Sequence, residues 1–80
     1  MNVLEVFAGN LKKYRNAIGL SQERFAEKAG LHRTYISAVE RGKRSIALDN
    51  VQKIADALEI ETYLLFVEEV KSKYQEGGET

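Results

Sequence analysis

One stretch, residues 20–42, constrains the fold of this 80-residue chain more than any other. Ser21 belongs to a residue type that caps helix N-termini, and the helix-forming run that follows it stops at Gly30. A second short helix is expected from about Arg33 to Arg41, with His32 at its N-cap position. The sequence therefore predicts two short helices joined by a tight turn, with the rest of the chain as a scaffold that holds the second of them.

Three longer helical segments are expected around this pair. Apolar residues at the spacing of one helical face run from about Val3 to Ile18, from about Leu48 to Leu58 and from about Thr62 to Tyr74. We therefore expect an all-α fold of five helices in a single domain at residues 1–74, followed by a polar, glycine-rich and disordered tail at 75–80. The faces expected in the core include Val3, Phe7, Leu11, Tyr14 and Ile18 of the first helix and Leu48, Val51, Ile54, Ala55 and Leu58 of the fourth.

The composition limits the class of protein. Pro is absent, which favours helix, and Cys is absent, so that no disulfide framework exists and a reducing compartment is expected. The longest apolar run is far too short to span a bilayer and no secretion signal is visible, so that we expect a soluble, cytoplasmic protein without a membrane partner. A domain of this size is marginally stable, and pairing with a second copy would stabilise it.

The charge of the chain is unevenly distributed although its net charge is zero. Residues 12–44 carry nine Lys and Arg against three Glu, a net charge of +6. Residues 45–80 carry three Lys against eight Asp and Glu, a net charge of −5. Such a bipolar molecule can bind phosphate groups at one end and keep its acidic end away from them, although charge clusters of this kind also arise by chance on protein surfaces.

The layout at about residues 21–41 is typical of a helix-turn-helix, in which the second helix enters the major groove of DNA. Three residues on the outer side of that helix are candidates for base contacts. Arg33 is the strongest, because a guanidinium group can donate two parallel hydrogen bonds to O6 and N7 of guanine. Thr34 could bond a base or touch a thymine methyl, or it could satisfy a free N–H at the helix start. Ser37 is small enough to let the helix approach the bases, or it is a neutral exposed serine.

A second set of residues is expected to bind the DNA backbone, which sets position and salt dependence but carries no sequence information directly. Tyr35 could bond a phosphate, or it could be an amphipathic aromatic residue at the edge of the core. The cations in the loop after the helix could instead only keep the surface soluble. The expected backbone contacts are Gln22, Tyr35, Arg41, Lys43 and Arg44.

The residues at Gln22, 33–40 and Gly42 resemble the phage Cro/C1-repressor family of helix-turn-helix proteins, and the resemblance covers about residues 8–66. Within that family, His32-Arg33-Thr34-Tyr35-Ile36-Ser37 is most similar to the controller proteins of restriction–modification systems. The other matching segments are Gly19-Leu20-Ser21-Gln22, Ala26 with Gly30, Val39-Glu40-Arg41-Gly42-Lys43 and Ile54-Ala55-Asp56-Ala57-Leu58.

The resemblance implies a five-helix, lambda-repressor-like domain that dimerises through its C-terminal helix and regulates transcription at paired half-sites. It also implies that Gln22 contacts phosphate and braces the second helix of the motif, whose first residues reach base edges. Arg15 and Glu40 match a partly buried ion pair between the first and third helices. Relatives often carry Asn-Pro-Ser before the fourth helix, where this chain has Ser45-Ile46-Ala47, so that the fourth helix is expected to lack a hydroxyl cap.

The expected fifth helix carries the argument for a dimer. Its apolar residues cover more than the ~100° that an amphipathic helix buries against its own domain. A two-fold related copy would cover the second side, although a long first helix within the same chain is the competing explanation. The interface is expected at Tyr63, Leu65, Phe66 and Val70.

No catalytic constellation is visible in the sequence. His32 is the only His and Cys is absent, so that we expect no metal site, no cofactor, no small-molecule substrate and no enzymatic activity. We expect a homodimeric, sequence-specific DNA-binding transcriptional regulator, with a double-stranded operator as its partner and RNA polymerase as a candidate second partner. The alternatives are a prophage-type repressor and a protein-binding adaptor or antitoxin that acts through the C-terminal helix.

Overall fold

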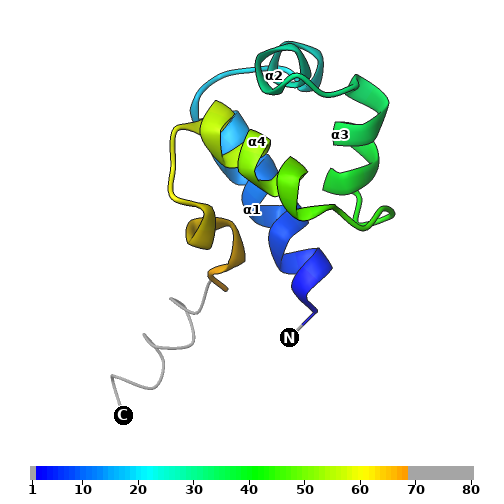
Figure 1. Ribbon diagram of the computed structural model, residues 1–80, viewed down its shortest axis with the longest axis vertical. Helices are drawn as coiled ribbons and strands as arrows, with labels where there is room; N and C mark the ends of the chain where they lie inside the picture. Colours follow the sequence, from blue (N-terminus) through cyan, green and yellow to red (C-terminus); the bar gives the residue numbers. More distant parts are fainter. Residues whose placement is uncertain (1, 69–80) are drawn as a thin grey trace.

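The computed structural model describes residues 2–68, which form four α-helices and one short 3-10 helix, with no strand in this part of the chain. In Figure 1, α2 lies at the top, α3 at the right and η1 at the lower left, around the overlapping α1 and α4. The bounds of these elements are Val3–Ala17 for α1, Gln22–Ala29 for α2, Arg33–Glu40 for α3, Leu48–Leu58 for α4 and Thr62–Phe66 for η1.

The four α-helices lie within one residue of their predicted limits, because local signals start and stop them. Ser21 Oγ accepts a hydrogen bond from Arg24 N, and His32 Nδ1 accepts one from Thr34 N, which confirms both predicted N-caps. α4 follows Ala47 and begins without a side-chain cap, as the absence of a hydroxyl residue at that position predicts.

One face of each helix packs into a single hydrophobic core. η1 is attached to α1 in two ways. The centroid of the Phe66 ring lies 5.4 Å from that of the Phe7 ring. The Asn10 side-chain amide donates hydrogen bonds to the carbonyl oxygens of Leu65 and Val67, at 2.9 and 3.0 Å. Because Asn10 is itself buried, these bonds satisfy a polar group that would otherwise destabilise the core. The large side chains with almost no exposed surface are Phe7, Leu11, Phe25, Ile36, Val39, Ile54 and Leu65.

The prediction of a fifth α-helix from Thr62 to Tyr74 is wrong for its described part. The chain forms only the 3-10 helix η1 there, and Val67 is extended, with φ −84° and ψ 120°. In an α-helix, residues two apart do not face the same side, so one amide group could not bond the carbonyl oxygens of both Leu65 and Val67, as Asn10 does here. The fold of residues 2–68 therefore has four α-helices instead of five, and the predicted contact at Val70 lies outside the described residues.

The placement of Leu65 in a dimer interface is also wrong. Its side chain has no exposed surface, because η1 inserts it between α1 and α4 in the core of its own chain. Phe66 is partly buried against the same core, whereas Tyr63 is 64% exposed. Three residues predicted in the core are instead exposed, namely Val3, Ile18 and Leu48. They lie at the ends of their helices, at the rim of the core.

Candidate nucleic-acid interface

The orientation of α3 is determined by its apolar face. Ile36 and Val39 have no exposed surface, which turns the opposite side of this short helix toward solvent. Arg33 and Thr34, in the first turn, are exposed, and Ser37, one turn later, is half-buried. The three predicted base-contacting residues therefore lie on the outward side of α3, the helix at the right-hand edge in Figure 1.

Contacts within α3 orient the polar groups on this outward side. The Thr34 hydroxyl lies 2.8 Å from His32 Nδ1, the same ring nitrogen that accepts the Thr34 backbone N–H at 3.3 Å. One turn further, an Arg41 guanidinium N–H donates to Ser37 Oγ. Ser37 thus accepts a hydrogen bond and keeps its own hydroxyl hydrogen for donation.

Tyr35 connects α3 to the loop and helix that follow it. Its hydroxyl oxygen accepts a hydrogen bond from the Asn50 side-chain amide at 3.1 Å, and the Arg44 guanidinium lies over its ring, 5.0 Å from the centroid. Tyr35 is half-buried, so that it belongs both to the edge of the core and to the surface predicted to face DNA. Asn50 was not predicted as part of the site, because nothing local in the sequence indicates a contact across the loop.

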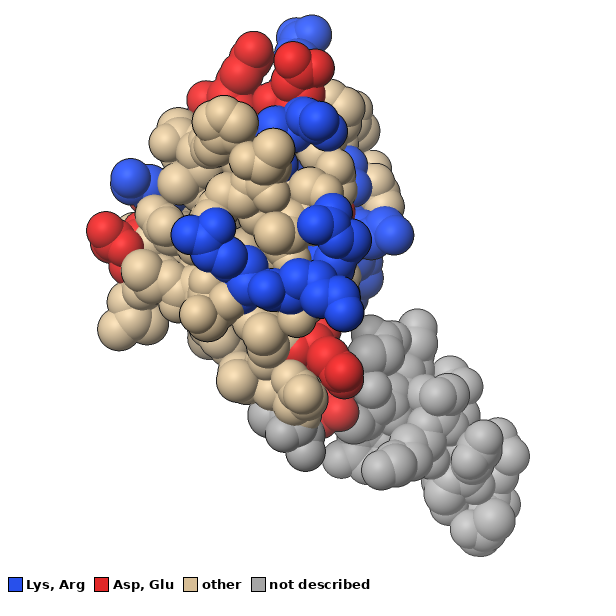
Figure 2. Space-filling view, turned by 90° about the vertical axis from the view of Figure 1, so that its right-hand side faces the viewer, with Lys and Arg blue, Asp and Glu red and all other residues tan. Residues whose placement is uncertain are grey.

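Lys and Arg side chains form a band on the face that carries α3. Figure 2 views the right-hand side of Figure 1, and the band crosses the middle of this face, with acidic side chains at the top, at the left edge and directly below it. Arg33, Arg41, Lys43 and Arg44 are all exposed. Because exposed cations on one face create a positive potential over it, this face can attract a polyanion although the whole chain is neutral.

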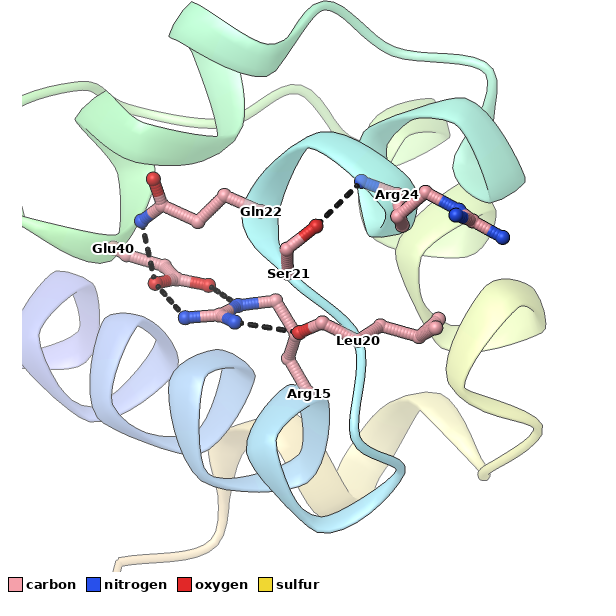
Figure 3. A network of polar contacts seen from close by, with 6 residues as sticks. All are labelled: Arg15, Leu20, Ser21, Gln22, Arg24 and Glu40. Carbon is pink, nitrogen blue, oxygen red and sulfur yellow. Dashed lines mark hydrogen bonds and ion pairs between the residues drawn. The ribbon is translucent and has the colours of Figure 1, made fainter.

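A buried polar network supports the other end of α3 (Figure 3). Arg15 donates to both carboxylate oxygens of Glu40, at 2.6 and 3.0 Å, so that the predicted ion pair is present. Arg15 also donates to the Leu20 carbonyl oxygen at 2.7 Å, and Gln22 donates to Glu40 at 3.0 Å. Only 9% of the Arg15 side chain and 3% of the Glu40 side chain are exposed. The network therefore connects the end of α1, the start of α2 and the end of α3.

The electrostatics of this network favour the charged form of Arg15. The hydrogen bond to the Glu40 carboxylate raises the pKa of the Arg15 guanidinium above its usual value, and the negative charge of Glu40 adds to this effect, while burial opposes it. Gln22 was predicted to contact phosphate and to brace the recognition helix. Its bond to Glu40 supplies the bracing, and its second amide hydrogen is the group left for a phosphate.

Other site chemistries find no support in residues 2–68. This part of the chain holds no group of three or more His, Cys, Asp and Glu placed to bind a metal ion. None of the helices described in it has the length and apolar character needed to cross a bilayer. The exposed cations of the basic band suit a polyanionic ligand.

Comparison with known proteins agrees with this geometry. A helix-turn-helix family model matches residues 11–65. Control protein C.SmaI from Serratia marcescens is 48% identical over 58 residues, which span 72% of this chain and 69% of that protein. The crystal structure of the restriction-modification controller protein C.AhdI from Aeromonas hydrophila has a TM-score of 0.76 and 48% identity, over 79% of this chain and 91% of that chain. C.Esp1396I bound to a 19 base pair DNA duplex has a TM-score of 0.75 and 33% identity, over 82% of this chain and 88% of that chain. This chain belongs to the helix-turn-helix family.

Proposed function

We propose that this protein is a transcriptional regulator of the restriction–modification controller type, which binds a symmetric DNA operator as a homodimer in the cytoplasm. In this proposal α3 of each protomer enters the major groove. Arg33, Thr34 and Ser37 contact base edges, and Gln22, Tyr35, Arg41, Lys43 and Arg44 contact the phosphate backbone. RNA polymerase is a further proposed partner for an operator that lies next to a promoter.

The single observation that carries the proposal is the two-sided character of α3. Its apolar side is completely buried, while Arg33 and Thr34 extend from the exposed first turn, where a recognition helix contacts bases. The basic band extends the same face beyond the helix with Lys43 and Arg44, which suits the phosphates that flank the groove. C.Esp1396I, which is similar in fold and sequence, is bound to a DNA duplex in its structure.

Exposed apolar side chains support the dimer. Tyr63 on η1 and Val67 directly after it are 64% and 49% exposed, and Phe66 is only partly covered by its own protomer. We place the interface at Tyr63 and Phe66, with Val70 as a predicted further contact. A two-fold axis beside η1 would present two copies of α3 to successive major grooves, which lie ~34–36 Å apart along one face of a duplex.

DNA binding is tested by fluorescence anisotropy on duplexes from the region upstream of the protein's own gene, with a scrambled duplex as control. We expect at least about 10³-fold tighter binding to one upstream duplex than to the scrambled duplex. A plot of log affinity against log salt concentration should have a slope of about −0.9 for each phosphate that the protein neutralises. Equal and weak binding to all duplexes would contradict the proposal and would favour a protein-binding adaptor.

The dimer is tested by sedimentation of Tyr63→Asp. Because Tyr63 is exposed, this charge should leave the protomer folded but separate the dimer, and it should weaken operator binding at low protein concentration. Ile18→Asp introduces the same charge at an exposed apolar residue that follows α1 and should leave the dimer intact. A Tyr63→Asp protein that sediments like the wild type would move the interface elsewhere.

A further inference from the structure

We propose that His32 is a specificity-determining residue, which orients the Thr34 hydroxyl so that it can only accept a hydrogen bond from DNA. Thr34 would then favour bases that present an amino group in the major groove. This inference rests on the proposed function, because it concerns the side of α3 that is assigned to DNA. His32 acts through Thr34 and is therefore a positioning residue.

The two contacts of His32 determine which of its ring nitrogens carries hydrogen. The Thr34 backbone N–H can only donate, so that Nδ1, which lies 3.3 Å from this nitrogen, must accept. A neutral imidazole then carries its hydrogen on Nε2. The Thr34 hydroxyl lies 2.8 Å from the same Nδ1, which carries no hydrogen in this tautomer. We infer that the hydroxyl donates its single hydrogen to the ring and shares the one Nδ1 lone pair with the backbone N–H.

This arrangement leaves the Thr34 oxygen with lone pairs only. Thr34 is exposed in the first turn of α3, so that these lone pairs can meet a donor from outside the protein. In the major groove, adenine N6 and cytosine N4 are donors, whereas guanine O6 and thymine O4 are acceptors. The Thr34 oxygen should accept a hydrogen bond from the amino group of adenine or cytosine, and it should repel the carbonyl oxygen of guanine or thymine. A threonine with a freely rotating hydroxyl would tolerate both.

Ser37 provides an internal contrast on the same side of the helix. Its oxygen accepts from the Arg41 guanidinium, so that its hydroxyl hydrogen stays available for donation. The two hydroxyl groups of α3 therefore present opposite polarity to a duplex. Ser37→Ala is therefore a comparison variant for this one position. It should leave the amino preference assigned to Thr34 in place, although its overall affinity should fall because Ser37 is itself a proposed base contact.

The test selects duplexes that bind the full-length protein from a randomised library and measures the affinity of each base substitution. Thr34→Val, which removes the hydroxyl at constant size, identifies the position that Thr34 reads. There the wild type should prefer adenine or cytosine over guanine or thymine on one strand by about 5- to 150-fold, the range of one good base contact. His32→Ala should relax the preference at this position and at no other.

A merely structural role for His32 would give a different pattern. In that case His32→Ala would weaken binding to all duplexes equally through loss of the N-cap. His32→Asn retains an acceptor oxygen for both the backbone N–H and the hydroxyl, and it should restore the amino preference. The double variant His32→Ala/Thr34→Val should show no weaker base preference at this position than Thr34→Val alone, because both changes remove the same interaction.

The outcomes separate this inference from the proposed function. Replacement of the preferred adenine by purine, which lacks the amino group, should reduce wild-type affinity but not the affinity of Thr34→Val. A wild-type preference for guanine or thymine at this position, or a preference that His32→Ala leaves unchanged, would overturn the inference alone. If His32→Ala does not fold, loss of the preference in Thr34→Ser, which keeps the hydroxyl, would overturn it instead. Failure to select any duplex would overturn both the inference and the proposed function.

Discussion

The two ends of α3 are built in opposite ways. At the C-terminal end, Glu40 is almost completely buried and receives hydrogen bonds from Arg15 of α1 and Gln22 of α2. At the N-terminal end, Arg33 and Thr34 are exposed, and Thr34 bonds to the adjacent His32. A helix of eight residues thus has one end that is positioned by the rest of the molecule and one end that can meet a ligand.

This difference separates two kinds of energetic effect. A buried ion pair gains little net stability when formed, since desolvation offsets the attraction, but loss of one partner leaves an uncompensated buried charge. An exposed side chain can be replaced with little effect on folding, although it can contribute strongly to binding. Substitutions at the C-terminal end of α3 should therefore change the free energy of unfolding, and substitutions at the N-terminal end should change DNA affinity.

The largest effect is expected from Arg15→Met. This change leaves the Glu40 carboxylate buried without its cation and should lower the free energy of unfolding by about 3–5 kcal/mol, as measured by urea denaturation. That is a large fraction of the about 4–12 kcal/mol typical of a chain of this length. The double variant Arg15→Met/Glu40→Leu should recover most of the loss. If Arg15→Met lowers the free energy of unfolding by less than about 1 kcal/mol, the Arg15–Glu40 pair is no stronger than an exposed ion pair. The proposed difference between a structural and a ligand-binding end of α3 would then be wrong.

A smaller effect is expected from Gln22→Leu. It removes one hydrogen bond to a charged group while Arg15 remains in place, and it should cost about 1.5–3 kcal/mol of stability. Because Gln22 is also a proposed phosphate contact, affinity for operator and random duplexes should fall by the same factor. Glu23→Gln, at the exposed neighbouring residue, is the control. Weakening on the operator alone would show that Gln22 contributes to base recognition, contrary to this expectation.

At the N-terminal end, Arg33→Ala should leave the unfolding transition within about 0.5 kcal/mol of the wild type. Its affinity for the preferred duplex should fall by about 1–3 kcal/mol, with little change on random DNA, when both are titrated at one salt concentration. The reason is that a guanidinium group that bonds a guanine edge contributes only at the matching base. Equal losses on both duplexes would make Arg33 a phosphate contact.

The smallest effect is expected from Lys43→Ala in the loop that follows α3. Lys43 is exposed, and a phosphate contact from it would weaken binding uniformly across sequences. The slope of log affinity against log salt should become shallower by about one. An unchanged slope would mean that this part of the basic band lies away from the duplex.

Local signals explain which parts of the fold could be predicted. α4 begins at Leu48 and ends at Leu58 as its apolar period predicts, and Ser21 and His32 cap the helices that follow them. The outward position of Arg33 likewise follows from helical periodicity once the start of α3 is known. In each case the determining residues lie within a few positions of one another in the chain.

Long-range contacts explain what could not be predicted. The apolar pattern after Thr62 is helical, but Asn10, 55 residues from Leu65 in the sequence, bonds to the carbonyl oxygens of both Leu65 and Val67, which an α-helix would turn to different sides. Leu65 thus belongs to the core of the protomer, although its pattern indicated an interface. The bond from Asn50 to Tyr35 also joins separate elements, and neither asparagine carries a local signal for its partner.

By itself the sequence determined an all-helical domain, the limits of its four α-helices and the side of α3 that faces solvent, because helix caps and apolar periodicity act over one or two turns. The tertiary structure alone decided that η1 is short, that Leu65 is internal and that Tyr35 bonds to Asn50. Those outcomes depend on hydrogen bonds and apolar contacts between segments far apart in the sequence, which form only when the elements pack together.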